Sequence, residues 1–434
     1  MTTQAPESVI SNHQSVMAAP SPLEGAPAWF TDAQAKAWET YSALPKPSRT
    51  DETWRFGDLK QLDFDAFAPA GFVDSDDIDM EISGLENTAA QFIFANDDLV
   101  HAEADLPEGV ICLPLADALN EHAELVEKYF MQGDTKLGSA KYAALHKAHL
   151  SNGLFVYVPK NVEVDLPIEV YHIVSGENAA IFPHTLVVTE DNAKVTIVDY
   201  FKTAGDKPAL CIAMNDLIAG TGSNLNYSAI QDLNLASKII QINNTKVEKD
   251  ANAKGFILNV GAIWARNESL STLSGAGAHS DMLSISIPAG EQKYDQRTFQ
   301  DHSAAHTYSD LLYKNTLYGN AKTVFSGLIS VEEGAHYTDA YQTCRNLLMD
   351  DTTEANSMPG LQINADQVKC SHGSTAAAIS DEEIFYLKAR GVQPKVARQL
   401  IARGFSVEVV ERLENEELEA LVLAYIDAKF KAVV

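Results

Sequence analysis

Two residues that could bind a soft metal ion lie two positions apart, in a segment whose sequence is typical of a β-strand. They are Cys370 and His372, in the run Asp366-Gln-Val-Lys-Cys-Ser-His-Gly373. Side chains at positions i and i+2 of a strand point to the same face, so we expect the thiol and the imidazole to project together. A zinc site needs about four ligands, so this pair would need partners from elsewhere in the fold or from another chain. The competing interpretation is that Cys370 is simply a small core residue.

Other histidines and cysteines form weaker patterns. His146 and His149 are three apart on one predicted helical face, without a third ligand nearby in the sequence. His302 and His306 are four apart in strand-like sequence, where such positions also share a face, but no glutamate completes an HExxH motif. Structural roles are therefore favoured for both pairs, and Cys344 is expected in the core.

Composition narrows the class of protein. The 434 residues carry 60 Asp and Glu against 32 Lys and Arg, a formal charge of −28. Nucleic acids and anionic membrane surfaces attract clustered Lys and Arg, so neither is expected as a partner. The four scattered cysteines form no CxxC pair, and we recognise no secretory signal or membrane span. There is no GxSxG elbow and no P-loop. We expect a soluble, cytoplasmic protein that is not itself an ATPase.

Periodicity divides the chain into four segments. Residues 1–28, rich in Ala, Pro and Ser, are expected to be a disordered leader. Residues 29–150 contain helical patterns, at 29–44, 116–129 and 141–149, together with short apolar runs, and predict a helical or mixed N-terminal domain. Residues 151–374 are β-rich, and residues 375–434 are helical.

The β-rich body consists of short strands of period two without an amphipathic helix between them. The tripeptide Asn-Ala-Lys recurs before apolar strands at residues 192–194, 252–254 and 320–322. A recurring turn and strand favours a stacked β-solenoid over a βαβ sheet, which would need intervening helices. A β-sandwich is the main alternative, although the hairpin dipeptides Asn-Gly and Asp-Gly are missing from Leu154 onward in this stretch.

The helical tail has clear start and stop signals. Ser380 and Glu383 form a capping box, Gly391 ends the first helix, and Pro394 opens a second that we expect to stop at Gly404. The last helix, residues 416–430, has an apolar face. That face either packs on its own domain or docks a partner, and periodicity alone favours the first.

Several runs of sequence follow one another in a fixed order along the chain: Pro47-Ser-Arg49, Glu52-Thr-Trp-Arg55, Gly153-Leu-Phe-Val-Tyr-Val-Pro159, Leu166-Pro-Ile168, Phe182-Pro-His-Thr-Leu-Val-Val188, Tyr313-Lys314, Val324-Phe-Ser-Gly-Leu-Ile-Ser-Val331, Thr338-Asp339-Ala-Tyr-Gln342, Asn346-Leu-Leu348, Asp366-Gln-Val-Lys-Cys-Ser-His-Gly373 and Phe385-Tyr-Leu-Lys-Ala-Arg-Gly391. Together these runs resemble the SufB/SufD family of iron–sulfur cluster assembly proteins, over about residues 45–410. Asp350-Asp351, in place of a cysteine, and Gly373, after His372, indicate the SufD branch by this resemblance.

The resemblance implies a fold and a function. The fold would be a right-handed parallel β-helix between N- and C-terminal helical domains. The chain would be a non-catalytic scaffold of the SUF complex, pairing with a SufB-like subunit through β-helix edges and binding a SufC-like ABC ATPase through its helical tail. Whether it forms a homodimer without the SufB-like subunit is left open.

The same resemblance assigns site residues. An iron–sulfur cluster would form transiently at the SufB–SufD interface, shared with the partner and not held tightly by this chain alone. His372 would be an interface ligand, and Cys370 a secondary ligand or a structural residue. The candidates for docking the ATPase are Phe385, Tyr386, Arg390 and Gly391.

Two alternative functions stay open on the sequence. One is a β-helix polysaccharide lyase or hydrolase, which would need a groove with clustered acids. The other is a purely structural subunit that holds the ATPase, with His372 incidental.

Overall fold

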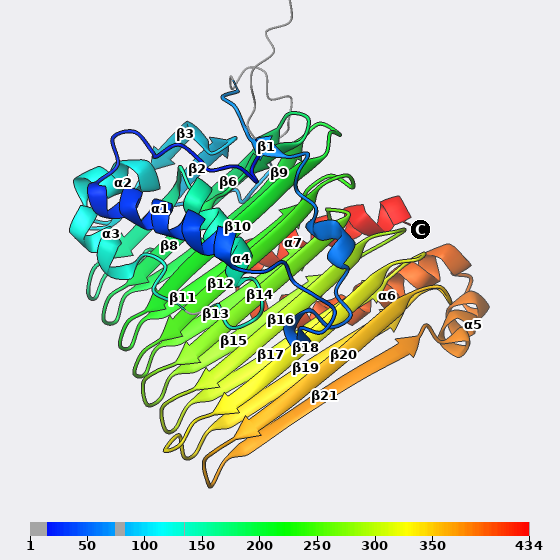
Figure 1. The fold of residues 1–434 in the computed structure, drawn as a ribbon. Coiled ribbons are helices and arrows are strands. Elements are labelled where there is room, and N and C mark those ends of the chain that lie inside the picture. The colour runs from blue at the N-terminus through cyan, green and yellow to red at the C-terminus, as the bar shows by residue number, and fades with distance from the viewer. Residues whose placement is uncertain (1–14, 74–82, 134, 434) are drawn as a thin grey trace, which may run out of the picture.

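The chain winds through two facing sheets, and from β8 onward successive strands alternate between them (Figure 1). This is a computed structural model, in which residues 15–73, 83–133 and 135–433 are described. We call the two sheets sheet A and sheet B. In spatial order sheet A contains β20 (Glu354–Ile363), β18 (Lys322–Val331), β16 (Lys293–His302), β14 (Trp264–Leu273), β12 (Lys238–Val247), β10 (Ala209–Ala219), β8 (His184–Thr189), β5 (Gly153–Val158) and β4 (Ile111–Pro114). In addition, β7 (Ala179–Ile181) pairs with β10, and β1 (Ala68–Pro69) pairs with β7.

Sheet B has the matching strands of each turn. In spatial order it contains β21 (Lys369–Ala378), β19 (Asp339–Leu348), β17 (Tyr308–Leu317), β15 (His279–Ser286), β13 (Asn252–Asn259), β11 (Asn224–Asp232), β9 (Lys194–Ala204), β6 (Ile168–Ser175), β2 (Ala90–Ala95) and β3 (Asp98–Ala104). Among the described strands all neighbours are parallel except β2 with β3 and β4 with β5. The predicted β-solenoid is confirmed, and the alternative of a β-sandwich is wrong.

The register explains why the repeat was hard to see in the sequence. From β5 onward, each strand residue pairs with one that lies 26 to 32 positions further on, from Lys238 with Trp264 to Lys322 with Glu354. The turns between strands absorb the difference in length, while the strands themselves stay in register. Alternate side chains therefore form columns that face either the space between the sheets, which we call the lumen, or the outside.

The lumen changes character along its axis. In the early turns it is filled by apolar side chains, such as Val195 and Ile197 of β9 and Ala213 of β10. In later turns buried polar side chains replace them, and many of these hydrogen-bond to one another. Gln300 donates to Ser309 over 2.7 Å, and Asn315 donates to Asn346 over 2.9 Å.

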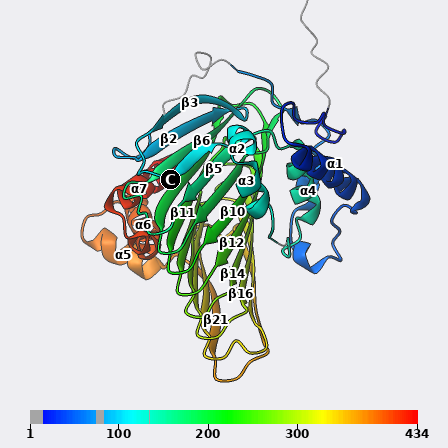
Figure 2. The same cartoon turned by 90° about the vertical axis from the view of Figure 1, so that its left-hand side faces the viewer.

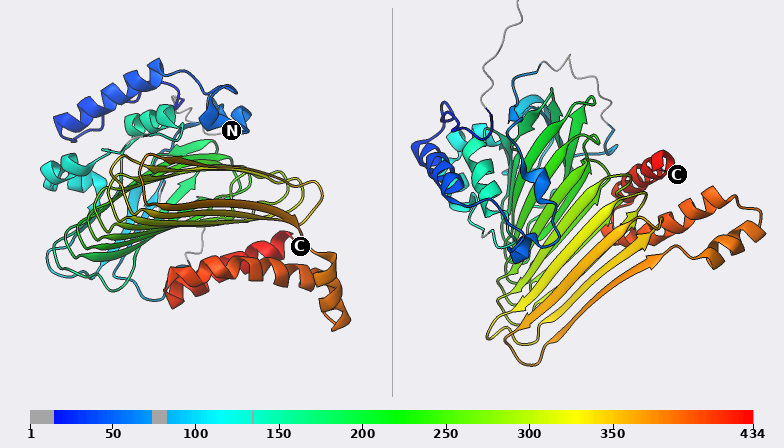
Figure 3. Two further views of the ribbon diagram at one scale, coloured as in Figure 1. Left: turned by 90° about the horizontal axis from the view of Figure 1, so that it is seen from below. Right: turned by 45° about the vertical axis from the view of Figure 1, so that its right-hand side comes forward.

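Helices cover the outer faces of the two sheets (Figures 2 and 3). On sheet A lie α1 (Ala28–Ala43), α2 (Leu115–Glu121), α3 (Ala123–Tyr129) and α4 (Ala140–His149). On sheet B lie α6 (Pro394–Val410) and α7 (Glu416–Val433), while α5 (Asp381–Ala389) stands away from the sheets at the edge of the molecule (Figure 1). Short 3-10 turns occur at Glu52–Trp54, Leu59–Leu62 and Glu411–Leu413. None of the helices in the described residues is long and apolar enough to cross a membrane.

Several boundaries differ from those expected. The solenoid begins before residue 151, because β2 pairs with β6 and β4 pairs with β5. It also continues past residue 374, because residues 374–378 pair with β19. In the predicted leader, residues 1–14 lie outside the described residues, whereas Val16 is fully buried and its N–H donates to the Phe67 carbonyl over 2.9 Å.

The C-terminal helices show where packing overrides a local signal. The stop expected at Gly404 is wrong, because α6 runs on to Val410. Ala402, Val409 and Val410 are buried against sheet B, and this packing outweighs the cost of about 1 kcal/mol that a glycine brings to a helix interior. The apolar face of α7 packs against the same sheet, so the interpretation that it packs on its own chain is confirmed.

A buried group of charges fastens the segment around Glu52–Trp54 to sheet A. The Trp54 ring is buried, and the Arg266 guanidinium lies 3.6 Å from its centroid. Arg266 is fully buried and reaches Asp295 over 2.5 Å, and Asp295 also accepts from Arg297 over 2.6 Å. Arg297 in turn donates to the Arg55 carbonyl over 2.8 Å. Arg266 also donates to the buried carboxylate of Glu268 over 2.7 Å, so two carboxylates compensate the two buried cations that hold the N-terminal segment in place.

We expect Asp295→Ala to lower the free energy of unfolding by about 3–5 kcal/mol, because it removes the counter-charge of the buried Arg297 and leaves Arg266 with Glu268 alone. Urea unfolding measures the loss. As a matched control, Asp191→Ala removes an exposed ion pair with Lys160 (2.7 Å) and should cost less than about 1 kcal/mol. Equal losses in the two variants would contradict the importance of the buried group.

Candidate functional site

Cys370 and His372 lie on β21, the last strand of sheet B. Cys370 pairs with Ala340 of β19, and His372 pairs with Gln342. Both side chains face the lumen, because their partners on β19 are buried there. The expectation that the two project from one face is thus met by the backbone register.

The two side chains differ in their surroundings. Cys370 is half-buried and packs against a small apolar cluster that includes Ile329, Val331 and Ala340. Burial, and then the charge of Asp339, raise the pKa of its thiol. His372 is exposed. The imidazole is therefore available to a ligand or a partner, whereas the thiol is partly withdrawn into the protein.

The last turn of the solenoid is open on one side. β20 and β21 are the end strands of their sheets within the described part of the chain, so each has one edge without a neighbouring strand (Figure 3). Leu361 and Ile363, near the end of β20, are 36 % and 42 % exposed. An unpaired strand edge offers free N–H and C=O groups that readily pair with another chain.

Further ligands are not supplied by this chain in the described regions. No group of three or more His, Cys, Asp or Glu side chains in residues 15–73, 83–133 and 135–433 is arranged to hold a metal ion. Cys370 and His372 are thus two side chains with metal-binding chemistry at an open end of the fold.

The four residues of the predicted docking site lie on or just after α5. Phe385 and Tyr386 are 70 % and 56 % exposed, and α5 has no buried residue. The Arg390 guanidinium lies 4.4 Å from the Tyr386 ring centroid. Gly391 has φ +85°, which ends the helix in the left-handed conformation that glycine favours. The helix therefore presents two aromatic side chains to its surroundings.

The other histidine pairs have structural roles. His146 is fully buried with Nδ1 2.7 Å from the Ile212 carbonyl, and burial lowers the pKa of His149 to about 4. His302 is buried between Thr307 and Ser309, 2.7 Å from each hydroxyl. The idea that His302 and His306 share a strand face is wrong, because β16 ends at His302 and His306 lies in the following turn, stacked on Tyr337.

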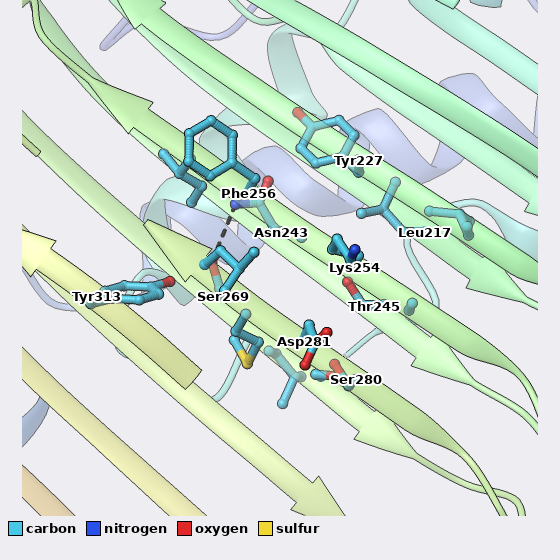
Figure 4. Close-up of a pocket in the computed structure, with 18 residues that line it drawn as sticks. Leu217, Tyr227, Asn243, Thr245, Lys254, Phe256, Ser269, Ser280, Asp281 and Tyr313 are labelled. Atoms are coloured by element: carbon cyan, nitrogen blue, oxygen red, sulfur yellow. Dashed lines mark hydrogen bonds between the residues drawn. The ribbon is translucent and has the colours of Figure 1, made fainter. Parts of the chain in front are cut away.

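The lumen contains a small cavity far from Cys370 and His372 (Figure 4). Its volume of about 30 Å³ is roughly that of one water molecule. Tyr227, Asn243, Ser269 and Ser280 line it, and Asn243 donates to Ser269 over 3.3 Å. The cavity is too small for a substrate, so it belongs to the packing of the solenoid.

Two groups of residues escaped the sequence patterns. The buried charges around Arg266 and Asp295 belong to different turns, so the sequence shows them only as isolated charges in strand-like runs. Gln342 falls inside a family motif, but its position beneath His372 follows only from the pairing of β19 with β21. The spacing of about 30 residues between these positions is the signal that could have linked them.

Known proteins match the chain along most of its length. The family model described as SUF system FeS cluster assembly, SufBD core domain, matches residues 172–405, and the model for the SufBD protein N-terminal region matches residues 23–170. The iron–sulfur cluster assembly protein SufD of Bacillus subtilis (strain 168) is 28% identical over 423 residues, covering 93% of this chain and 95% of the relative. An iron–sulfur cluster assembly SufBD family protein of Synechocystis is 27% identical, covering 88% of this chain and 87% of the relative.

We expect Cys370 to be the thiol that reacts first in the folded protein. Cys112, Cys211 and Cys344 are buried, and burial raises the pKa of Cys344 to about 12. Labelling with a water-soluble disulfide reagent should modify one thiol per chain quickly, faster as the pH rises because the thiolate reacts. Cys370→Ser should abolish this fast phase. A fast phase that survives the substitution would contradict the burial pattern.

Proposed function

This chain belongs to the SufBD family of SUF-system iron–sulfur cluster assembly proteins, and from that premise we propose that it is a non-catalytic scaffold subunit of a SUF complex. It pairs with a SufB-like subunit and carries a SufC-like ATPase. The cluster is the cargo of this assembly and forms where the two scaffold chains meet. The polysaccharide lyase considered on the sequence has no support in this family.

The observation that carries the proposal is the position of His372. Its exposed imidazole lies on the last strand of the solenoid, beside the half-buried thiol of Cys370. Imidazole and thiolate are both accepted ligands of iron in clusters. Two ligands at an unpaired strand edge are too few to hold an iron–sulfur cluster. A partner chain that pairs with this edge can supply the remaining ligands.

The open ends of β20 and β21 suit a partner of the same architecture. A second solenoid can continue both sheets by backbone hydrogen bonds, as in strand addition. Leu361 and Ile363 would then become buried, which removes apolar surface from water. Because the pairing would cover the face of His372, a movement of one scaffold against the other could close or release the cluster.

The helical tail suits the docking of an ATPase. Exposed aromatic side chains are the residues that most often dominate binding energy at interfaces. Phe385 and Tyr386 lie on a helix that contributes nothing to the core, so their exposure is not explained by folding. Hydrolysis by the docked subunit could then move the C-terminal helices and the adjoining strand β21.

We expect His372→Ala, in a complex co-expressed with SufB- and SufC-like subunits, to reduce cluster formation at least tenfold while the complex still assembles. Iron and sulfide content of the anaerobically purified complex measures the yield. Ser371→Ala is the matched control, because Ser371 lies on the same strand and faces the opposite side. An unchanged yield in His372→Ala would favour the alternative that this chain only holds the ATPase.

Replacing both Phe385 and Tyr386 with alanine should weaken binding of the ATPase subunit at least tenfold, since such aromatic anchors each contribute about 2 kcal/mol or more. Titration of the purified ATPase against the variant measures the affinity, and circular dichroism checks the fold. Leu235→Ala is the control, because Leu235 is an equally exposed apolar side chain (60 %) on a turn of the solenoid. Unchanged binding in the double variant would place the docking site elsewhere.

A further inference from the structure

Gln342 has a buried side-chain amide that lacks hydrogen-bond partners in the described residues. It is 1 % exposed, and neither its Nε2 nor its Oε1 has a hydrogen-bond partner among the described residues. Leaving a buried donor and acceptor unpaired is costly, so native proteins rarely do so without a reason. The position therefore calls for a polar group that can approach the amide.

The side-chain amide of Gln342 extends across the lumen to Gly327 of the opposite sheet. A Cβ atom added at Gly327 of β18 would come within 2.0 Å of Gln342 Nε2 and 2.6 Å of Thr298 Oγ1. The missing side chain of Gly327 thus makes the space that Gln342 occupies. Nε2 faces Gly327 and Thr298. The amide oxygen Oε1 is therefore the atom that can accept a hydrogen bond from another group.

The neighbour in register with Gln342 on the open side is His372. The two residues are paired across β19 and β21, so their Cα atoms are about 4.8 Å apart and their side chains share a face. The His372 imidazole is exposed. From this placement we infer that Gln342 is a positioning residue for His372, whose Oε1 accepts the N–H of the ring nitrogen that is not used for binding iron.

The chemistry of imidazole explains the need for such a residue. A neutral imidazole has one N–H and one free lone pair, and the hydrogen bond made by one nitrogen decides which nitrogen can bind a metal. Metal-binding histidines usually donate their second N–H to a carbonyl, a carboxylate or water. Oε1 of Gln342 is a carbonyl oxygen on the residue that pairs with His372. This inference rests on the proposed role of His372 in binding the cluster.

The test uses the full chain labelled with ¹⁵N-histidine. Long-range ¹H–¹⁵N spectra report the ratio of the two tautomers of each histidine, and His372→Ala assigns the signal. We expect one tautomer of His372 to exceed its ratio in the exposed His101 about fivefold, the factor contributed by one ordinary hydrogen bond. Gln342→Leu should abolish this bias, and Gln342→Glu, which keeps an acceptor at the same reach, should retain it.

A second measurement takes Gln342→Leu into the co-expressed complex, where cluster yield should fall about tenfold. Gln296→Leu is the matched control, because Gln296 is also buried in the lumen with an unpaired Oε1 but lies on sheet A, where it does not pair with β21. Thermal unfolding of each variant shows whether the solenoid is intact.

The outcomes separate this inference from the proposed function. If His372→Ala removes the cluster while Gln342→Leu changes neither the tautomer ratio nor the yield, the positioning role is wrong and the proposed function stands. If His372→Ala leaves the yield unchanged, the proposed function is wrong, and the tautomer ratio still decides whether Gln342 holds the imidazole. Loss of the bias in Gln296→Leu would also overturn the inference, since it would mark a general effect of the lumen.

Discussion

Each turn of a parallel β-helix satisfies the backbone hydrogen bonds of the turn before it, and the last turn has no successor. In this chain that turn is formed by β20 and β21, whose outer edges are unpaired in the described residues. The same pairing fixes the register of every strand, so it also decides which side chains reach the lumen. Strand pairing between successive turns thus explains both the unpaired edge of β21 and the direction in which the side chains of Cys370 and His372 point.

Register also organises the charges and polar groups of the interior. Arg266 and Asp295 meet because β14 and β16 are neighbours, and Asn215 meets Asn243 because β10 and β12 are neighbours. These side chains are buried, and each is tolerated only because its partner lies at a fixed register position. Buried pairs of this kind, on the outer face of sheet A and in the lumen, favour one alignment of the strands, since a slip of one residue would separate each pair.

Local patterns were sufficient for much of the fold. The alternation of apolar and polar residues predicted the strands, and the lack of amphipathic helices between them predicted the solenoid. The capping box of Ser380 and Glu383 predicted the start of α5. The shared face of Cys370 and His372 also followed from strand periodicity alone. Where tertiary packing decides the outcome, local patterns failed: sheet B carries α6 through Gly404, and the turn after β16 separates His302 from His306. The setting of Gln342 depends on pairing across about 30 residues, which no short motif reports.

We have proposed that a SufB-like partner completes the site at the end of the solenoid. Hydrogen–deuterium exchange of the chain, alone and mixed with a SufB-like protein, measures which surface this partner covers. The amides of Glu354–Ile363 and Lys369–Ala378 should become strongly protected in the complex, while the outer helices α1 and α4 do not change. Protection of another surface, with β20 and β21 exchanging as in the free chain, would contradict the proposal.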